Sequence, residues 1–161
     1  MVEKDFETLQ TFLQQGGSMK MLADVEQHDL DLLHRYGNQL MNYGDYQGAK
    51  RIFYLLMKID QWNFDYFFAL GTCCQQLKEH EEAIFCFGRA GIVNVEDPRS
   101  PYYAGENYRA VGNAEYAVKS YNAALRVCDC HSDSKWDHIA EKANQALAQF
   151  NQEACYDSVS S

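Results

Sequence analysis

The sequence predicts an all-α protein built from repeated pairs of helices. Only two of its 161 residues are proline, so few positions interrupt a helix. It contains no sustained run of alternating β-branched residues, which would indicate a strand. Hydrophobic residues make up 47% of the chain, enough for a buried core, and the length is that of one domain with short appendages.

The strongest pattern is a repeat with a period of about 34 residues. Four columns of small, aliphatic or aromatic residues recur three times without a gap. Small residues at fixed helical phases and this period are typical of the tetratricopeptide repeat, a pair of antiparallel helices A and B. The columns are Gly37, Gly71 and Gly105; Ala49, Ala83 and Ala117; Phe53, Phe87 and Tyr121; and Leu56, Ala90 and Ala124.

The repeat predicts how the chain is divided. Residues 30–63, 64–97 and 98–131 are three tetratricopeptide repeats, preceded by a helical segment at 1–29 and followed by a capping helix at 132–155 and a tail at 156–161. We expect Ser134 to cap the start of the last helix. We expect the glycine of helix A and the alanine of helix B to lie where two helices cross closely, and the aromatic residue to fill the space between repeats.

The turns support this division. "YGDY" and "VGNAEY" carry glycine with Asp or Asn, which end one helix and cap the next, whereas the middle turn "LKEH" has no glycine. Both prolines, Pro98 and Pro101, fall in the first turn of helix A of the third repeat, where a missing N–H costs little. Asp97 is positioned to cap that start, so the prolines stiffen the segment that presents Tyr102 and Tyr103.

Helices A line the concave side of such arrays, and the period fixes which of their residues face it. We predict a groove for an extended peptide, with apolar anchor points between polar margins. The alternative is that Tyr102 and Phe68 only pack against neighbouring repeats. The predicted groove residues are His34, Asn38, Met41, Phe68, Thr72, Gln75, Tyr102, Glu106 and Arg109, with Tyr103 at the edge.

Composition excludes several other functions. The formal net charge of -9 disfavours binding to nucleic acid or anionic lipid. The acidic start resembles no signal peptide and no window has the length of a membrane span, so we expect a soluble cytoplasmic protein without membrane insertion. The six cysteines are interpreted as reduced and mostly buried. "CDCH" lacks a second ligand pair, and no motif places a nucleophile beside a histidine, so we expect no metal, cofactor or catalytic site.

Beyond the repeats, four segments resemble the class II (translocator) chaperones of bacterial type III secretion systems. They are "FLQQGGSMKML", "YGDYQGAKRIFYLLMKID", "FALGTCCQQLKEHEEAIFCFGRA" and "DPRSPYYAGENY". The resemblance extends from about Phe6 to about Phe150. It implies a non-enzymatic protein of the bacterial cytoplasm that holds an extended segment of a hydrophobic, pore-forming translocator in its concave groove. The residues that match groove columns of that family are His34, Met41, Phe68, Tyr102 and Glu106.

The resemblance also implies finer features. Many members form homodimers through the N-terminal helices, and some act with transcriptional regulators. The wording of the N-terminal segment and first repeat is closest to chaperones of the larger, two-span translocator. His34 and Asn38 depart from the aromatic residues common at their positions, which changes the shape of the first pocket.

Two other readings of the repeats are a generic peptide-binding adaptor or co-chaperone, and a scaffold whose groove is filled by its own residues 6–25. A co-chaperone that clamps a terminal carboxylate needs several cations and asparagines along helices A. Of five such positions, only those of Asn38 and Arg99 carry the required residue type, so we expect no clamp.

Overall fold

The structure is a computed structural model that describes Glu7 and residues 26–159. The predicted N-terminal segment, with its dimer contact and the alternative that it fills the groove, lies almost wholly outside these residues. Within them there are seven α-helices, one short 3-10 helix and no strand, so the predicted all-α class is confirmed. The helices are α2 (Gln27–Asn42), α3 (Tyr46–Ile59), α4 (Phe64–Gln76), α5 (His80–Val93), α6 (Arg99–Ala110), α7 (Ala114–Asp129), the 3-10 helix η2 (Ser134–Trp136) and α8 (Asp137–Val159).

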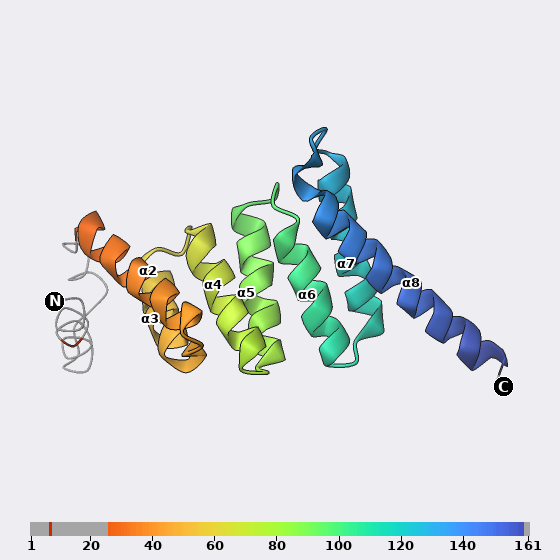
Figure 1. Cartoon of the computed structure of the whole chain (residues 1–161), viewed down its shortest axis with the longest axis horizontal. Helices are drawn as coiled ribbons and strands as arrows, with labels where there is room; N and C mark the ends of the chain where they lie inside the picture. The colour runs from red at the N-terminus through yellow and green to blue at the C-terminus, as the bar shows by residue number, and fades with distance from the viewer. Residues whose placement is uncertain (1–6, 8–25, 160–161) are drawn as a thin grey trace.

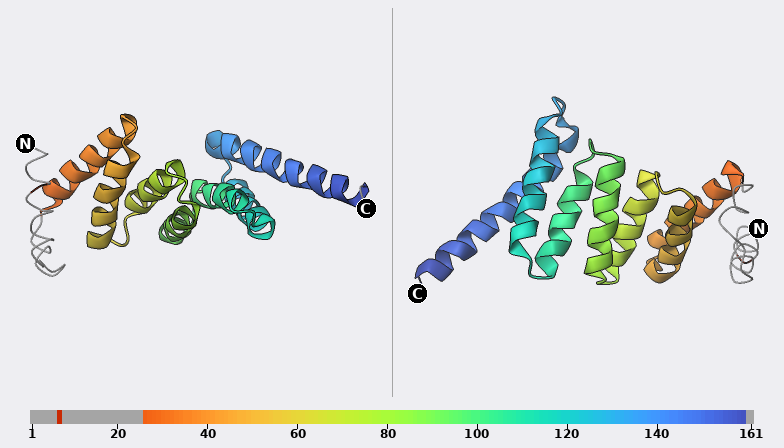
Figure 2. Two further views of the ribbon diagram at one scale, coloured as in Figure 1. Left: turned by 90° about the horizontal axis from the view of Figure 1, so that it is seen from below. Right: turned by 180° about the vertical axis from the view of Figure 1, so that it is seen from behind.

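The helices form three consecutive hairpins and a cap. Each packs mainly against the helix before and after it in the chain, and together they make one elongated row with α2 at one end and α8 at the other (Figure 1). The row is curved, and α2 and α8 rise at its two ends on the same side (Figure 2, left). The pairs α4–α5 and α6–α7 fall within the predicted repeats 64–97 and 98–131, whereas α2 begins at Gln27, three residues before the first predicted repeat at 30–63.

Each hairpin is closed by a glycine of its first helix and an aromatic ring of its second. A Cβ atom added to Gly37 would lie 2.9 Å from the ring of Phe53, and one added to Gly105 would lie 2.9 Å from that of Tyr121. Gly71 meets Phe87 in the same way, at 3.0 Å. The glycine therefore leaves room for the ring of its own repeat, within the close contact of two helices that the sequence predicts for the glycine and alanine columns. The alanines of that column are fully buried.

The turns inside the three hairpins share one backbone conformation. Gly44, Lys78 and Gly112 stand 34 positions apart and have φ angles of 80°, 64° and 78°. Each donates its N–H to the carbonyl three residues earlier, at 3.0–3.1 Å. The left-handed region is open to glycine but strained for a side chain such as that of lysine. The middle turn has no glycine in its sequence, so Lys78 adopts a backbone conformation that suits glycine. This strain lowers the free energy of unfolding.

Replacing Lys78 with glycine is expected to raise the free energy of unfolding by about 0.5–1 kcal/mol, because relief of the strained φ exceeds the entropy that glycine loses on folding. The measurement is urea denaturation followed by circular dichroism. Gly112→Lys is the reverse control and should destabilise the protein by about 1 kcal/mol. Equal stability of the two variants would show that these turns do not hold the strain assigned to them.

The C-terminal cap differs from its prediction at both ends. Ser134 lies inside η2 and makes no capping bond; α8 begins at Asp137. The helix continues to Val159, through residues expected to form a tail. The reason is that residues 151–159 contain neither glycine nor proline to end a helix. In the part of the chain that the structure describes, no helix has the length and apolar character needed to cross a membrane.

Candidate peptide-binding face

The ten residues predicted to bind a peptide lie on the first helices of the three hairpins, and we call the surface that they form the A face. It consists of His34, Asn38 and Met41 on α2, Phe68, Thr72 and Gln75 on α4, and Tyr102, Tyr103, Glu106 and Arg109 on α6. Eight of these side chains are half-buried, Asn38 is exposed and Tyr102 is buried. Half-buried residues are available to a ligand while remaining held by their neighbours.

The centre of the A face is a cluster of aromatic rings shared by the second and third repeats. The rings of Phe68 and Tyr103 meet edge to face, with centroids 5.8 Å apart. Phe64 stacks on Phe68 at 5.4 Å, and the buried Phe87 stacks on Tyr103 at 5.5 Å. These contacts fix the orientation of both half-buried rings, so the cluster offers a preformed apolar surface.

Tyr102 occupies a different environment from the one predicted. It is only 8% exposed and belongs to the core cluster that also contains Tyr121 and Trp136. Its ring contacts those of Tyr103 and Tyr121 at 5.1 and 5.8 Å. Burial raises the pKa of Tyr102 to about 12. The alternative interpretation, packing against neighbours, therefore describes Tyr102, and Tyr103 presents the more accessible ring.

The first repeat contributes a smaller apolar site. The ring of His34 contacts that of Tyr66 at 5.3 Å and that of Phe53 at 5.8 Å, both edge to face. Met41 is partly buried against the main core, and Asn38 lies exposed between them on α2. This end of the A face therefore presents the imidazole of His34 and the flexible side chain of Met41. The central cluster instead presents aromatic rings.

Asn107, which sequence reasoning missed, organises the polar side of the A face. Its amide nitrogen donates to Oε1 of Gln75 at 3.0 Å and to the carbonyl of Tyr103 at 2.8 Å. Its amide oxygen accepts from Nδ1 of His80 at 2.8 Å, which fixes the proton of that imidazole on Nδ1. Asn107 is 1% exposed, so this network joins α4, α5 and α6 and holds Gln75 in place. No sequence pattern indicated this role, because Gln75 and His80 lie in the preceding repeat.

Three other polar residues of the A face are also engaged. Thr72 donates its hydroxyl to the carbonyl of Phe68 within α4. Glu106 accepts a hydrogen bond from the hydroxyl of Tyr121 at 2.5 Å. Arg109 lies over the ring of Phe150 at 5.2 Å and 3.9 Å from the carboxylate of Glu153, so it links α6 to α8. These side chains are therefore structural as well as accessible.

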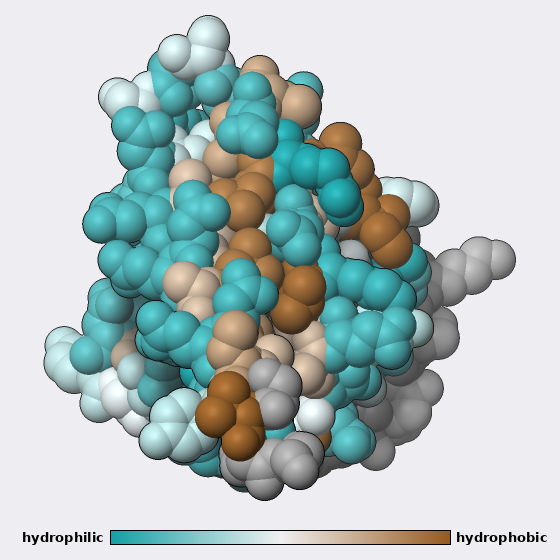
Figure 3. Space-filling model, turned by 90° about the vertical axis from the view of Figure 1, so that its right-hand side faces the viewer, coloured by the Kyte–Doolittle hydropathy of each residue, from teal (hydrophilic) through white to brown (hydrophobic). Residues whose placement is uncertain are grey.

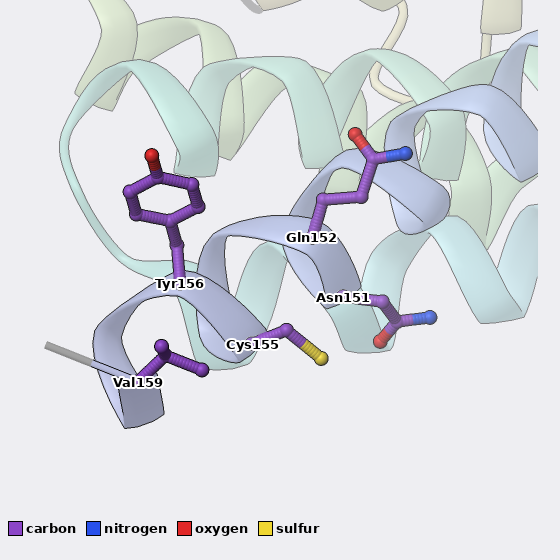
Figure 4. A pocket seen from close by; sticks show the side chains of 5 residues that line it. All are labelled: Asn151, Gln152, Cys155, Tyr156 and Val159. Carbon is purple, nitrogen blue, oxygen red and sulfur yellow. The ribbon is translucent and has the colours of Figure 1, made fainter.

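Two of the larger hollows found among the described residues lie outside the A face. One of about 450 Å³ lies among α5, α6 and α7, is mostly apolar, and includes Gly88, where an added Cβ would meet open space. The other, of about 780 Å³, is formed along the last turns of α8 by Asn151, Gln152, Cys155, Tyr156 and Val159 (Figure 4). Figure 3 shows hydrophobic side chains between hydrophilic margins on this end of the molecule. Neither hollow was predicted from the sequence.

All six cysteines lie among the described residues and are present as thiols. Cys73, Cys74 and Cys86 are buried, while Cys130 and Cys155 are exposed. Burial raises the pKa of Cys73 to about 12, which leaves its thiol protonated and unreactive near neutral pH. Among the described residues, no group of three histidine, cysteine or acidic side chains is placed to hold a metal ion.

Comparison with known proteins supports the resemblance. No family model matches the chain. The low calcium response locus protein H of Yersinia pestis is 28% identical over 98 residues, which are 61% of this chain and 58% of that protein. The alignment thus spans less than two thirds of the curated relative.

Solved structures match over more of the chain. A T3SS complex from Aeromonas hydrophila is 26% identical with a TM-score of 0.78, over 92% of this chain and 97% of that one. The type III secretion chaperone SycD of Yersinia enterocolitica, in complex with a peptide of the translocator YopD, is 18% identical with a TM-score of 0.76 over 81% of this chain and 98% of that one. SycD has also been solved in an alternative dimer. The resemblance predicted from the sequence is thus confirmed: the chain is similar to the type III secretion translocator chaperones and has their helical repeat fold.

Proposed function

We propose that this protein is a type III secretion chaperone that binds an extended segment of a hydrophobic translocator on its A face. The observation that carries the proposal is the preformed cluster of Phe68 and Tyr103, half-buried on the fold that in SycD accommodates a peptide of a translocator. Apolar side chains of the segment pack on these rings, and polar side chains along α2, α4 and α6 accept or donate to its backbone.

The binding keeps a membrane-active client soluble until export. A pore-forming protein exposes apolar segments that aggregate or insert in membranes, and covering one of them removes that hazard. The formal net charge of -9 adds repulsion between complexes and so favours solubility. In this proposal the protein acts in the bacterial cytoplasm, without enzymatic activity, and its client is the larger, two-span translocator. Homodimerisation through the N-terminal helices and an effect on transcription are further parts of the proposal.

A generic adaptor that clamps a terminal carboxylate is less well supported. At the positions where such a clamp needs polar or basic groups, Ala69 is buried and Tyr103 is stacked on Phe87. The guanidinium of Arg99 is already paired with Asp97. A client carboxylate would therefore meet no cluster of unpaired cations on the described part of the A face.

Co-expression tests the proposal. The chain is co-expressed with each translocator protein of the same secretion system. The amount of translocator in the soluble and pelleted fractions is then compared with and without the chain. We expect the larger translocator to become soluble and to co-purify with the chain as a stable complex. A translocator that stays in the pellet, with the chain purifying alone, would rule the proposal out. A peptide with the C-terminus of a heat-shock protein serves as the negative control.

A further inference from the structure

Arg99 stands at the start of α6 and is held in one position by Asp97. The carboxylate of Asp97, only 6% exposed, accepts from the backbone N–H of Arg99 at 3.0 Å. It also accepts from Nε at 3.0 Å and from Nη2 at 2.6 Å of the same guanidinium. A two-point contact of this kind fixes both the position and the plane of a guanidinium. The two residues belong to the "DPR" sequence at the start of the third repeat.

The fixed guanidinium lies directly over the aromatic cluster of the A face. Its central carbon is 4.7 Å from the centre of the Phe68 ring, 5.7 Å from that of Phe64 and 5.5 Å from that of Trp136. A cation over aromatic faces at these distances is attracted to them. Arg99 therefore joins the second repeat to the cap and borders the ring on which we expect the client to pack.

The described residues use only part of the hydrogen-bonding capacity of Arg99. A guanidinium has five N–H donors. Asp97 takes Nε–H and one hydrogen of Nη2, and no other described residue accepts from the donors that remain. The side chain is 37% exposed, so this outer edge can be reached from solvent. A segment lying across Phe68 would pass within hydrogen-bonding distance of it.

The charge of the pair selects the kind of acceptor. Asp97 already neutralises Arg99, so a second carboxylate at the outer edge would be repelled by the first. A main-chain carbonyl is a neutral acceptor, and an extended segment carries one unpaired carbonyl per residue. We propose that Arg99, positioned by Asp97, donates from its outer edge to a main-chain carbonyl of the client next to the residue that packs on Phe68. This inference rests on the proposed function.

The test begins with overlapping synthetic peptides that cover the translocator proteins of the same secretion system, each measured with the full chain by fluorescence anisotropy. Arg99→Met is expected to weaken binding of the selected peptide about 10- to 100-fold, as loss of a hydrogen bond to a charged donor does. Asp97→Asn should weaken it less, because the guanidinium remains but is no longer held. Arg99→Lys should recover part of the affinity. Circular dichroism melts of each variant check that the fold is kept.

Replacing single amide bonds of the peptide by esters gives a readout that a purely structural role would not change. An ester carbonyl is a poorer acceptor, so one ester should weaken binding to the wild-type chain and have little effect on Arg99→Met. If no peptide binds the wild-type chain, the proposed function is overturned. If a peptide binds and Arg99→Met binds it equally well, the inference fails and the function stands. If replacing peptide carboxylates by amides shows the coupling instead, the acceptor is a side chain and the carbonyl assignment is wrong.

Discussion

Replacing Tyr121 with alanine is expected to lower the free energy of unfolding by about 3–5 kcal/mol. The ring is fully buried and lies against Gly105, Tyr102 and Phe150, so it connects α6, α7 and α8. Its removal leaves a large cavity in the core cluster that packs the cap against α6 and α7. Urea denaturation followed by circular dichroism measures the loss, and we expect α8 to unfold first because a repeat array is stabilised by nearest neighbours.

Tyr121→Phe separates the ring from its hydroxyl. This variant keeps the packing and loses only the hydrogen bond to Glu106, so we expect a cost of about 1–3 kcal/mol. A loss below about 1 kcal/mol for Tyr121→Ala would show that the third repeat and the cap are stabilised elsewhere.

The same region predicts the response of stability to alkaline pH. Burial raises the pKa of Tyr121 above its usual value, and burial raises that of Tyr102 to about 12. In the unfolded chain both ionise near pH 10, at about their usual pKa. The folded state holds these protons more tightly, so its advantage is complete below about pH 10 and is lost as the pH rises towards 12 and beyond. The free energy of unfolding of Tyr121→Phe should therefore fall less steeply with pH across this range.

Replacing Phe68 with glutamate is expected to weaken translocator binding about 100-fold or more. Phe68 is half-buried at the centre of the A face, where aromatic anchors of an interface typically contribute most to affinity. Glutamate there would remove the ring on which the client packs and would place a charge beside an apolar residue of the client. The measurement is the affinity for the soluble client, or for its binding peptide, by calorimetry.

Phe85→Glu is the matched control. Phe85 is 61% exposed on α5 and lies outside the A face, so the same change of charge there should leave affinity within about twofold. Phe68→Ala provides a second variant that introduces no charge among the rings. Equal losses from Phe68→Glu and Phe85→Glu, with helical content intact, would exclude the A face as the binding surface.

The fold was predictable because one pattern repeats three times. Gly71 and Phe87 illustrate this: a glycine that admits a ring from the next helix is needed in every hairpin, so the same spacing recurs and reveals the period. The period also assigned Phe68 and Gln75 to the A face, and both are half-buried on α4. Helix boundaries followed from the turn residues, and the structure differs mainly at α8, which has no neighbouring repeat to define its end.

Features that depend on contacts between distant residues were not predictable in the same way. Tyr102 and Tyr103 are adjacent in the sequence, and only the packing of the cap on Tyr102 decides which of the two stays accessible. Asn107 looked like an ordinary polar helix residue because its partners, Gln75 and His80, lie in the preceding repeat. Lys78 adopts a positive φ, which is common for glycine and could not be predicted for a lysine from the sequence.

Photo-cross-linking to the client tests the central claim most directly. A photoreactive amino acid is placed at Thr72, in the middle of the A face, or at Gly88, which borders the hollow among α5, α6 and α7 and has open space around it. Each variant is co-expressed with the translocator and irradiated. We predict a cross-linked complex from Thr72 and none from Gly88. Cross-linking from Gly88 with none from Thr72 would show that the client binds the opposite side and would contradict the account.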